Sequence, residues 1–393
     1  MTDTGPYDVV IIGGGLYGCS TAYHLLSREP HLKVVIVEPD TKYEHAASAR
    51  SNGGVRVLFS QSESIYMSQY GHEFYSNFEA LMSTQTESAQ LDCFRNGYLL
   101  LGTQPHHVDD MMENLKLQHA LGCNVEVHDA AGIQSVRPHL NTEDVQIAIF
   151  SPDDMWIDPY SAVTGMLRKV RDMGVTLVRG RVQGFEQRHG RIHSIHLDDE
   201  RRLDSSWFVN CCGAWAPQLC EQAGFSVPVE PLPMMVYYFE TPAFEHNFGV
   251  TIDIDTVSFR PEGRGFISIN RRLGLQGNFH WETDPGLFEA DNWPKLAHRV
   301  PHFESLKVRS SYCCHYANNT FDGNLLLGAW PGAAENLLIA TGASGHGLQH
   351  APAAGRGLSE LILDGRFSTI DLARFGCRRV VDNHPDPERG FRA

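Results

Sequence analysis

Apolar residues gather in short runs near the start of the chain, separated by glycine and polar residues. Residues 8–12 read Asp-Val-Val-Ile-Ile, a β-branched run that predicts a buried parallel strand. After a glycine-rich turn, residues 20–26 have the composition of a helix, and residues 34–37 (Val-Val-Ile-Val) predict a second strand. This order is typical of a strand–helix–strand unit, because parallel strands need a crossover connection.

The rest of the chain alternates between helix-and-strand character and a β-rich stretch. A helical segment is predicted at about 61–83 and a hairpin-like segment near 97–101. From about 226 to 316 the residues alternate as they do in half-buried strands. A strand at 337–340 then leads through a glycine-rich turn into a helix that ends near Leu363. The polar tail after Gly376 is expected to fray.

At 393 residues the chain is long enough for two domains. We predict an α/β fold (a two-domain α+β arrangement) with a Rossmann-like domain in three pieces, interrupted twice by a β-rich domain. The Rossmann-like pieces are residues 1–88, 150–225 and 325–393, and the β-rich pieces are residues 89–149 and 226–324.

Composition narrows the class of partner. Lys and Arg number 32 against 47 Asp and Glu, so the formal net charge is 32 − 47 = −15. Nucleic acids and anionic membranes demand a cationic surface, so neither is expected as a partner. The nine cysteines include no C-x-x-C pair, and we expect no metal site and a reduced, cytoplasmic location. No export signal and no integral membrane segment are expected.

The turn after the first strand carries the first chemical motif. Gly13, Gly15 and Gly18 satisfy G-x-G-x-x-G, and Glu38 ends the second strand. In dinucleotide-binding folds the first glycine allows the tight turn, the second lets the backbone approach the pyrophosphate, and the third allows close helix packing. The helix N-terminus then faces the phosphates, and the acid faces the ribose hydroxyls. Gly14, Leu16 and Tyr17 belong to the same predicted turn.

Three further segments, together with the opening motif, resemble those of a known protein family. They are a small-residue loop at 46–56, the run Asn210-Cys211-Cys212-Gly213-Ala214-Trp215, and the run 340–347 (Ala-Thr-Gly-Ala-Ser-Gly-His-Gly). With the opening motif, their order resembles the D-amino-acid oxidase superfamily, in its sarcosine oxidase and glycine oxidase branch. Residues 293–301, 319–322 and 365–372 are similar to mitochondrial FAD-dependent oxidoreductase domain proteins that assist assembly of respiratory complex I.

The resemblance implies a two-domain fold of the sarcosine oxidase type with FAD at the domain interface. It also implies that the chain removes a hydride from the α-carbon of an amine or amino acid. Further FAD-binding residues are then expected at Ser48, Arg50, Ser51, Asn52, Gly53, Val182, Gly213, Trp215, Gly342, Ser344, Gly345, His346, Gly347, Leu348 and Gln349.

His346 and Arg56 are the candidate catalytic residues. His346 lies in the loop that passes the flavin in the family, although a histidine there can also serve only to satisfy loop hydrogen bonds. Arg56 resembles the family's substrate arginine, because a planar guanidinium binds a carboxylate in a bidentate way. Arg260 and Arg264 are reserve candidates, and a surface or ion-pair role is the alternative for each arginine.

Other predicted substrate contacts are Tyr238, Tyr316 and Gln349. Aromatic residues of strands are more often part of a core, which is the alternative for the two tyrosines. Gln349 stands where sarcosine oxidases carry a lysine that contacts the substrate carboxylate. This departure argues against sarcosine itself as the substrate.

Cys314 resembles the cysteine that sarcosine oxidases link covalently to the flavin. A covalent bond at Cys314 or Cys313 is one hypothesis, and a buried, unreacted cysteine is the other. The stretch that matches the family's oxygen-activating lysine is 266–268 (Phe-Ile-Ser), which contains no lysine. The absence of this lysine favours a dehydrogenase that passes electrons to a quinone or a carrier protein, but other charges and the backbone can also support reduction of O2, so the electron acceptor is expected to be O2 or another acceptor.

Two functions remain open on the sequence. The first is an FAD-dependent amine or amino-acid oxidase or dehydrogenase that forms an imine. The second is a flavin-containing assembly factor or chaperone that binds a protein partner with little turnover.

Overall fold

The structure is a computed structural model that describes residues 6–254, 256–271 and 274–389. Its first sheet contains the predicted strand–helix–strand unit. β1 (Tyr7–Ile12) lies parallel to both β2 (Val34–Val37) and β12 (Arg202–Asn210). β1 is buried along most of its length, which explains its unbroken run of β-branched residues. The other strands of this sheet are β9 (Thr176–Val178), β10 (Val182–Arg188), β11 (Arg191–Leu197), β18 (Leu326–Ala329) and β19 (Leu337–Thr341).

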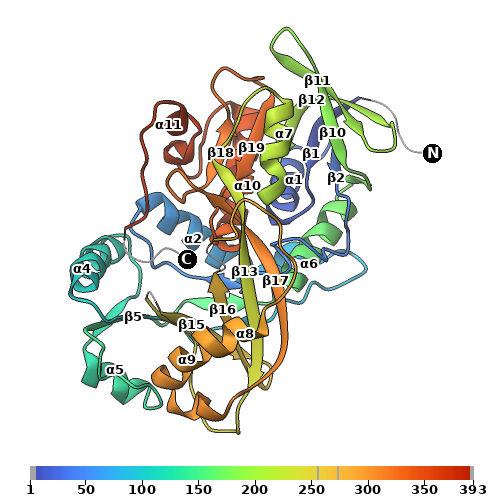
Figure 1. Ribbon diagram of the computed structural model, residues 1–393. Coiled ribbons are helices and arrows are strands. Elements are labelled where there is room, and N and C mark those ends of the chain that lie inside the picture. Colours follow the sequence, from blue (N-terminus) through green and yellow to red (C-terminus); the bar gives the residue numbers. More distant parts are fainter. Residues whose placement is uncertain (1–5, 255, 272–273, 390–393) are drawn as a thin grey trace.

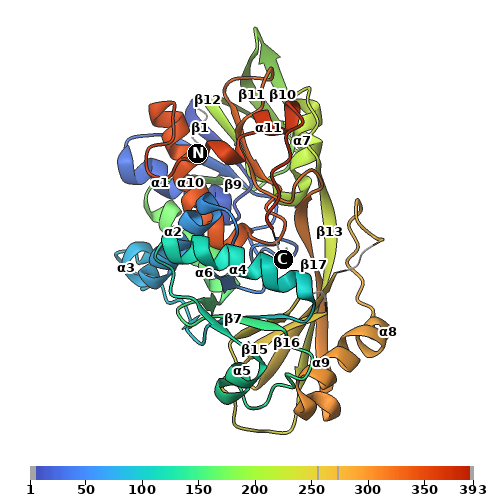
Figure 2. The same ribbon diagram turned by 90° about the vertical axis from the view of Figure 1, so that its left-hand side faces the viewer.

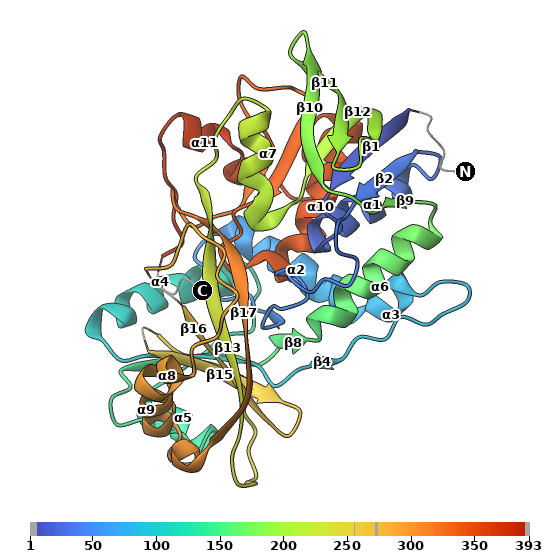
Figure 3. The ribbon, with the colours of Figure 1, turned by 45° about the vertical axis from the view of Figure 1, so that its right-hand side comes forward.

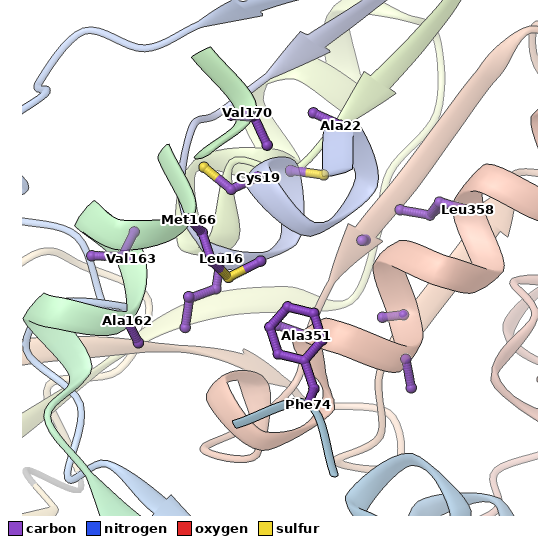
Figure 4. Close-up of a cluster of buried hydrophobic side chains, with 14 of the residues drawn as sticks. Leu16, Cys19, Ala22, Phe74, Ala162, Val163, Met166, Val170, Ala351 and Leu358 are labelled. Atoms are coloured by element: carbon purple, nitrogen blue, oxygen red, sulfur yellow. The ribbon is translucent and has the colours of Figure 1, made fainter. Parts of the chain in front are cut away.

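Helices pack together beside this sheet and form its main core. α1 (Leu16–Arg28) turns Leu16, Cys19 and Ala22 inward at helical spacing, and Figure 4 shows them facing α6 (Pro159–Asp172) and α10 (Gly347–Asp364). Phe74 of α2 (Ser62–Ser76) fills the space next to Ala351 of α10. The helix that follows the opening motif is therefore fixed from several sides.

The second sheet is built around two long strands. β13 (Val229–Glu240) and β17 (Lys307–Asn319) pair in antiparallel register from Val229↔Asn319 to Glu240↔Lys307. Figure 3 shows this pair running side by side from the first sheet into the lower half of the molecule. The remaining strands are β5 (Tyr98–Gly102), β6 (Glu126–His128), β7 (Ile147–Ser151), β14 (Val250–Asp253), β15 (Val257–Glu262) and β16 (Gly265–Arg271).

A small third sheet joins β3 (Gly54–Val55), β4 (Cys93–Phe94) and β8 (Met155–Ile157). Figure 2 shows α4 (Pro105–Ala120) above the second sheet and α5, α8 and α9 along its lower edge. The shorter helices are α3 (Phe78–Met82), α5 (Ala130–Val136), α7 (Ala216–Gln222), α8 (Pro285–Leu287), α9 (Trp293–Arg299) and α11 (Arg378–Val381).

The α/β fold and the opening unit are confirmed, and three local predictions need correction. The helical segment at 61–83 is two helices, α2 and α3, which meet at Asn77. The segment near 97–101 is not a hairpin, because β5 pairs with β7 and β14, which are distant in sequence. The described part of the tail does not fray: Glu388 is 4% exposed and accepts the backbone N–H of Ser60 at 2.7 Å.

The domain boundaries remain a proposal. The first sheet takes its strands from residues 7–37, 176–210 and 326–341, and the second takes most of its strands from residues 229–319. Figure 1 shows the two sheets at opposite ends of the molecule, with β13 and β17 reaching from one toward the other.

Candidate FAD and substrate site

The turn between β1 and α1 has a shape that requires glycine at two positions. Gly13 has a φ of +101°, and a Cβ there would lie 2.6 Å from the carbonyl oxygen of Cys211. A Cβ on Gly18 would lie 1.9 Å from the carbonyl oxygen of Gly13, so α1 packs on the strand only because no side chain intervenes. Gly15 lines a cavity instead. The start of α1, whose first N–H groups have no acceptor within the helix, therefore forms part of that cavity's wall, and the N–H of Leu16 there donates to Oγ of Ser48 at 3.2 Å.

Glu38 lies next to this turn at the end of β2. Its Oε2 accepts the backbone N–H of Gly14 at 2.8 Å, and its Oε1 accepts that of Asp40 at 2.9 Å. Burial, the largest effect, raises the pKa of the carboxyl, and these two N–H donors oppose it. Glu38 lines the same cavity as Gly15. A contact with ribose hydroxyls is compatible with this position and stays a prediction.

The cavity has a volume of about 1160 Å³ and is shared by both sheets. Its walls come from the opening turn, the loop at 45–56, the segment after β12, strands β13, β16 and β17, and the turn at 343–349. Sites for single small ligands usually occupy roughly 300–1,000 Å³. This cavity therefore has room for a dinucleotide and a small substrate.

Most of the predicted site residues line this cavity. They are Gly13, Gly15, Leu16, Tyr17, Glu38, Ser48, Ser51, Asn52, Arg56, Val182, Gly213, Trp215, Tyr316, Ser344, Gly345, His346, Gly347, Leu348 and Gln349. Eight others are not among its lining residues, namely Gly14, Gly18, Arg50, Gly53, Tyr238, Arg260, Cys314 and Gly342. Segments that lie far apart in sequence thus meet around one space.

Arg56 and His346 are in contact inside the cavity wall. Nη2 of Arg56 lies 3.2 Å from Nε2 of His346, and Nη1 donates to the carbonyl oxygen of Leu58 at 2.6 Å. The guanidinium also lies over the ring of Phe59, 4.2 Å from its centroid. The backbone N–H of Arg56 donates to Oε1 of Gln349 at 2.8 Å. Three predicted residues of the substrate site therefore form one connected group.

The electrostatics of this group follow from burial. Burial is the main cause that holds the pKa of His346 well below its usual value, and the positive charge of Arg56 adds to it. Burial also lowers the pKa of Arg56, against opposing effects from Tyr98 and two carboxylates. One of these, Asp154, accepts the backbone N–H of Val57 with both oxygens at 3.1 Å. Backbone hydrogen bonds from Arg56 to Gln349 and from Val57 to Asp154 thus hold the loop that carries the arginine.

Arg260 and Tyr238 lie elsewhere. Nε of Arg260 donates to the carbonyl oxygen of Asn52 at 2.8 Å, and its Nη1 pairs with Glu262. Arg260 therefore ties β15 to the loop at 45–56. The hydroxyl of Tyr238 lies 3.2 Å from Oε1 of Glu240. Because neither side chain lines the cavity, we withdraw both from the substrate site.

The adjacent cysteines of β17 are buried on opposite faces of the sheet. Cys314 packs with Met234 and Val236, whereas Cys313 packs with Met235 in the core of the second sheet. Burial, followed by the effect of Cys313, raises the pKa of the Cys314 thiol to about 12. Cys314 is therefore a neutral thiol next to the cavity, while the following residues, His315 and Tyr316, line it.

Several lining residues were missed in the sequence. Arg271 lies at the end of β16, and burial, the largest effect, lowers its pKa, while Tyr316 opposes this. Phe279 and Trp281 line the cavity from the segment that follows β16. The available signal was an Asn-Phe-His-Trp run (278–281) with two large aromatic residues in an otherwise polar stretch. Arg264, the other reserve arginine, has a side chain that is 90% exposed.

The described residues contain neither a candidate metal cluster nor a candidate membrane-spanning helix. Among those residues, no group of three or more His, Cys, Asp or Glu side chains is arranged to hold a metal ion. Within the same part of the chain, no helix is both long and apolar enough to cross a membrane.

Comparisons with known proteins agree with this geometry. The family model described as "FAD dependent oxidoreductase" (DAO) matches residues 8–361. FAD-dependent oxidoreductase domain-containing protein 1 from Xenopus laevis is 34% identical, over 98% of this chain and 84% of the relative. The protein of the same name from Bos taurus is 35% identical, over 94% and 83%. Human mitochondrial sarcosine dehydrogenase is 24% identical over 96% of this chain but only 42% of its own length.

Solved structures show the same fold at low sequence identity. L-proline dehydrogenase from P. horikoshii matches with a TM-score of 0.86 and 20% identity, covering 97% of this chain and 99% of that one. Glycine oxidase from Geobacillus kaustophilus matches with a TM-score of 0.82 and 19% identity, covering 95% and 99%. The chain belongs to the DAO family of FAD-dependent oxidoreductases, and FAD is its cofactor.

Proposed function

We propose that the protein oxidises the C–N bond of an amino acid or N-substituted amino acid to an imine. The observation that carries the proposal is the shared cavity, in which Arg56, Tyr316, His346 and Gln349 line the same space as the glycine turn. Similar proteins support it, since two solved structures are a proline dehydrogenase and a glycine oxidase, and a relative is a sarcosine dehydrogenase.

The residues present fit FAD. The glycine turn, Glu38 and the helix start offer the elements that a dinucleotide requires, and the cavity extends beyond them to β17. When bound, the flavin supplies the group that accepts a hydride. The protein's task is then to bind the substrate, orient its α-carbon and exclude water.

Arg56 and Arg271 are the arginines that line the cavity wall next to Tyr316 and His346. A guanidinium holds a carboxylate by charge-assisted hydrogen bonds, and burial strengthens such bonds. We assign Arg56 to the substrate carboxylate and to the support of His346, and Tyr316 and Gln349 to the wall of the substrate pocket.

His346 acts as a neutral residue. Arginine nitrogens carry only donors, so Nε2 of His346 must accept at the 3.2 Å contact with Arg56. The low pKa of the ring keeps it uncharged at neutral pH, and its proton then resides on Nδ1. His346 is therefore a hydrogen-bond donor in the site and not the base that deprotonates the substrate, which must enter with its amine neutral.

Anaerobic reduction of the flavin tests this function. The holoprotein is mixed without oxygen with a panel of free and N-alkyl amino acids, and the loss of flavin absorbance is followed. We expect one class of amino acid to bleach the flavin. Matched amines that lack the carboxylate should react far more slowly. If no member of the panel reduces the flavin while dithionite does, the proposed oxidation is wrong.

An assembly or regulatory role is the second candidate. One relative, 25% identical, is the mouse mitochondrial pyruvate dehydrogenase phosphatase regulatory subunit, so this group of sequences includes a named regulator. The anaerobic reduction experiment distinguishes the two candidate functions. A binding protein that uses flavin only for stability would keep its flavin oxidised with every amine, whereas an amino-acid oxidase or dehydrogenase would not.

The electron acceptor and the location remain proposals. O2 and a separate carrier are both open as acceptors, and the rate of flavin reoxidation by air after substrate reduction distinguishes them. We also retain the predicted cytoplasmic location, although several relatives are named as mitochondrial. Fractionation of cells that express the full chain tests it.

A further inference from the structure

The segment at 384–389 packs against the loop that carries Arg56. Oε2 of Glu388 accepts the backbone N–H of Ser60 at 2.7 Å, and the hydroxyl of Ser60 donates to the same oxygen. The backbone N–H of Arg389 donates to the hydroxyl oxygen of Ser60 at 2.7 Å. Because Glu388 is only 4% exposed, its bonds to Ser60 form where little water competes for them.

Contacts of Asp386 hold this segment in place independently of Glu388. The backbone carbonyl oxygen of Asp386 accepts Nε2 of Gln61 at 2.8 Å and Nδ2 of Asn324 at 2.6 Å. The carboxylate of Asp386 pairs with Arg374 at 2.6 Å. A change at Glu388 alone therefore leaves the segment attached to the protein and removes only its bonds to Ser60.

Ser60 ends a short stretch of chain whose other members hold the guanidinium of Arg56. Nη1 of Arg56 donates to the carbonyl oxygen of Leu58 at 2.6 Å, and the ring centroid of Phe59 lies 4.2 Å from the guanidinium carbon. The ring of Phe59 also contacts that of His346 edge-on, with 5.0 Å between the centroids. A shift of the backbone at Ser60 would therefore move the groups that orient the arginine.

We propose that Glu388 is a positioning residue for the substrate: by fixing Ser60, it holds Arg56 in the orientation that binds the substrate carboxylate. Neither Glu388 nor Ser60 is among the described residues that line the cavity, so the glutamate acts through the loop and does not touch the substrate. Its charge also favours a charged arginine, because burial, the largest effect, lowers the pKa of Arg56, while Tyr98 and then Glu388 oppose this. The inference rests on the proposed function, in which Arg56 binds a carboxylate.

Three variants separate the bond to Ser60 from a general loosening of the segment. Glu388→Ala removes the acceptor of Ser60. Glu388→Gln keeps a side-chain carbonyl oxygen that can accept the same N–H, but it removes the charge. Glu113→Ala is the matched control, because it removes another contact of the segment, the pair between Glu113 and Arg389 at 3.1 Å, whose side chains are 67% and 69% exposed.

Carboxylate binding is measured without turnover. The holoprotein is titrated with acetate, propionate and benzoate, which carry a carboxylate and no amine, and the Kd is read from the change in flavin absorbance. We expect the Kd to rise about fivefold or more in Glu388→Ala, the effect of losing a hydrogen bond to a charged group. The rise should be smaller in Glu388→Gln, and the Kd should stay within about twofold in Glu113→Ala. FAD content should match that of wild type in all three variants.

The kinetics of flavin reduction distinguish positioning from a general structural defect. In Glu388→Ala, the amino-acid concentration that gives half of the maximal reduction rate should rise about as much as the carboxylate Kd. The limiting rate should change less, because the flavin and the walls of the cavity stay in place. A structural defect would instead lower the FAD content and the thermal stability of the holoprotein.

Several results would overturn the proposal. A wild-type carboxylate Kd in Glu388→Ala is one, and an equal rise in Glu113→Ala is another, because loosening of the whole segment would then be the cause. A wild-type flavin spectrum that none of the carboxylates perturbs is the third, since Arg56 would then bind no carboxylate. If the carboxylates bind as expected but no amino acid reduces the flavin, the proposed oxidation is wrong and the positioning role of Glu388 is retained.

Discussion

The guanidinium of Arg56 donates to the imidazole of His346 across 3.2 Å, inside the wall of the cavity that both residues line. This contact links the residue proposed to hold the substrate carboxylate to the residue proposed to act beside the flavin. The contact fixes the tautomer of His346, because an arginine nitrogen can only donate a hydrogen bond. Nε2 of His346 must therefore accept, and the ring proton resides on Nδ1. A change at Arg56 should therefore affect both carboxylate binding and the state of His346.

Replacing Arg56 by lysine should weaken the reaction with carboxylate-bearing amines by about tenfold or more. Lysine keeps the charge but loses the bidentate geometry, and hydrogen bonds to charged groups contribute roughly 1.5–3 kcal/mol. Stopped-flow reduction of the flavin at several substrate concentrations measures the loss. Arg264→Lys is the control, since that side chain is 90% exposed. If the kinetics of Arg56→Lys are unchanged, Arg56 does not hold the substrate carboxylate, and Arg271 becomes the candidate for that role.

Gly15→Leu should abolish retention of FAD while the protein still folds. Gly15 lines the cavity, and the nearest atom to a Cβ there is Ser48 Oγ at 3.1 Å, so a larger side chain is forced into the space for the pyrophosphate. Flavin absorbance after gel filtration measures how much FAD is retained, and circular dichroism checks that the variant is folded. A yellow Gly15→Leu protein with wild-type FAD content would contradict the assignment of the turn.

The sequence alone was sufficient to predict the parts of the site that depend on local backbone conformation. The turn at 13–18 and Glu38 follow from sterics and strand order, which a short segment determines by itself. Arg260 and Arg271 show where prediction from the sequence fails. Both belong to adjacent strands of one sheet, and only tertiary packing decides that Arg260 binds Asn52 while Arg271 lines the cavity.

Long-range contacts explain the other differences. β5 resembles half of a hairpin, yet its partners lie in β7 and β14, and alternation along one strand does not specify its partner. The tail after Gly376 is polar, but Arg379 pairs with Asp322 at 2.7 Å and Glu388 binds Ser60, so distant polar groups hold it in place. Composition alone cannot distinguish such a tail from a frayed one.

The free energy of unfolding should fall as the pH is lowered from about 6.5 to 4. Burial holds the pKa of His24 and of His350 at about 3 and that of His315 at about 4. The unfolded histidines titrate near 6.5, so the unfolded chain binds protons in this window that the folded chain does not bind. Above pH 6.5 these groups add no pH dependence, and each can contribute up to about 1.4 kcal/mol per pH unit below it.

Urea unfolding of the holoprotein with excess FAD at pH 7.5, 5.5 and 4.5 measures this slope. His350→Gln keeps a terminal amide for the contact with Ser68 Oγ, which lies 3.1 Å from Nε2 of His350, and should flatten the slope. His106→Gln, at an exposed position, is the matched control and should not flatten it. A stability that does not change between pH 7.5 and 4.5 would contradict neutral buried histidines.

The last prediction concerns the hypothesis of a covalent bond between FAD and Cys314. Such a bond requires a thiolate at the flavin edge. Cys314 is 3% exposed, packs with Met234 and Val236, and does not line the cavity, and its pKa is raised to about 12. The positive charge of Arg50 opposes this rise in pKa, but it is the smallest of the effects on the thiol. We therefore expect FAD to be bound without a covalent link.

Acid precipitation decides the point, because free FAD stays in the supernatant and linked FAD pellets with the protein. All of the flavin should remain soluble in wild type, Cys314→Ser and Cys313→Ser, and the intact mass should equal that of the polypeptide alone. A pellet that is yellow in wild type and colourless only in Cys314→Ser would establish the bond. It would also mean that FAD binding rearranges β17 so that this thiol reaches the cavity.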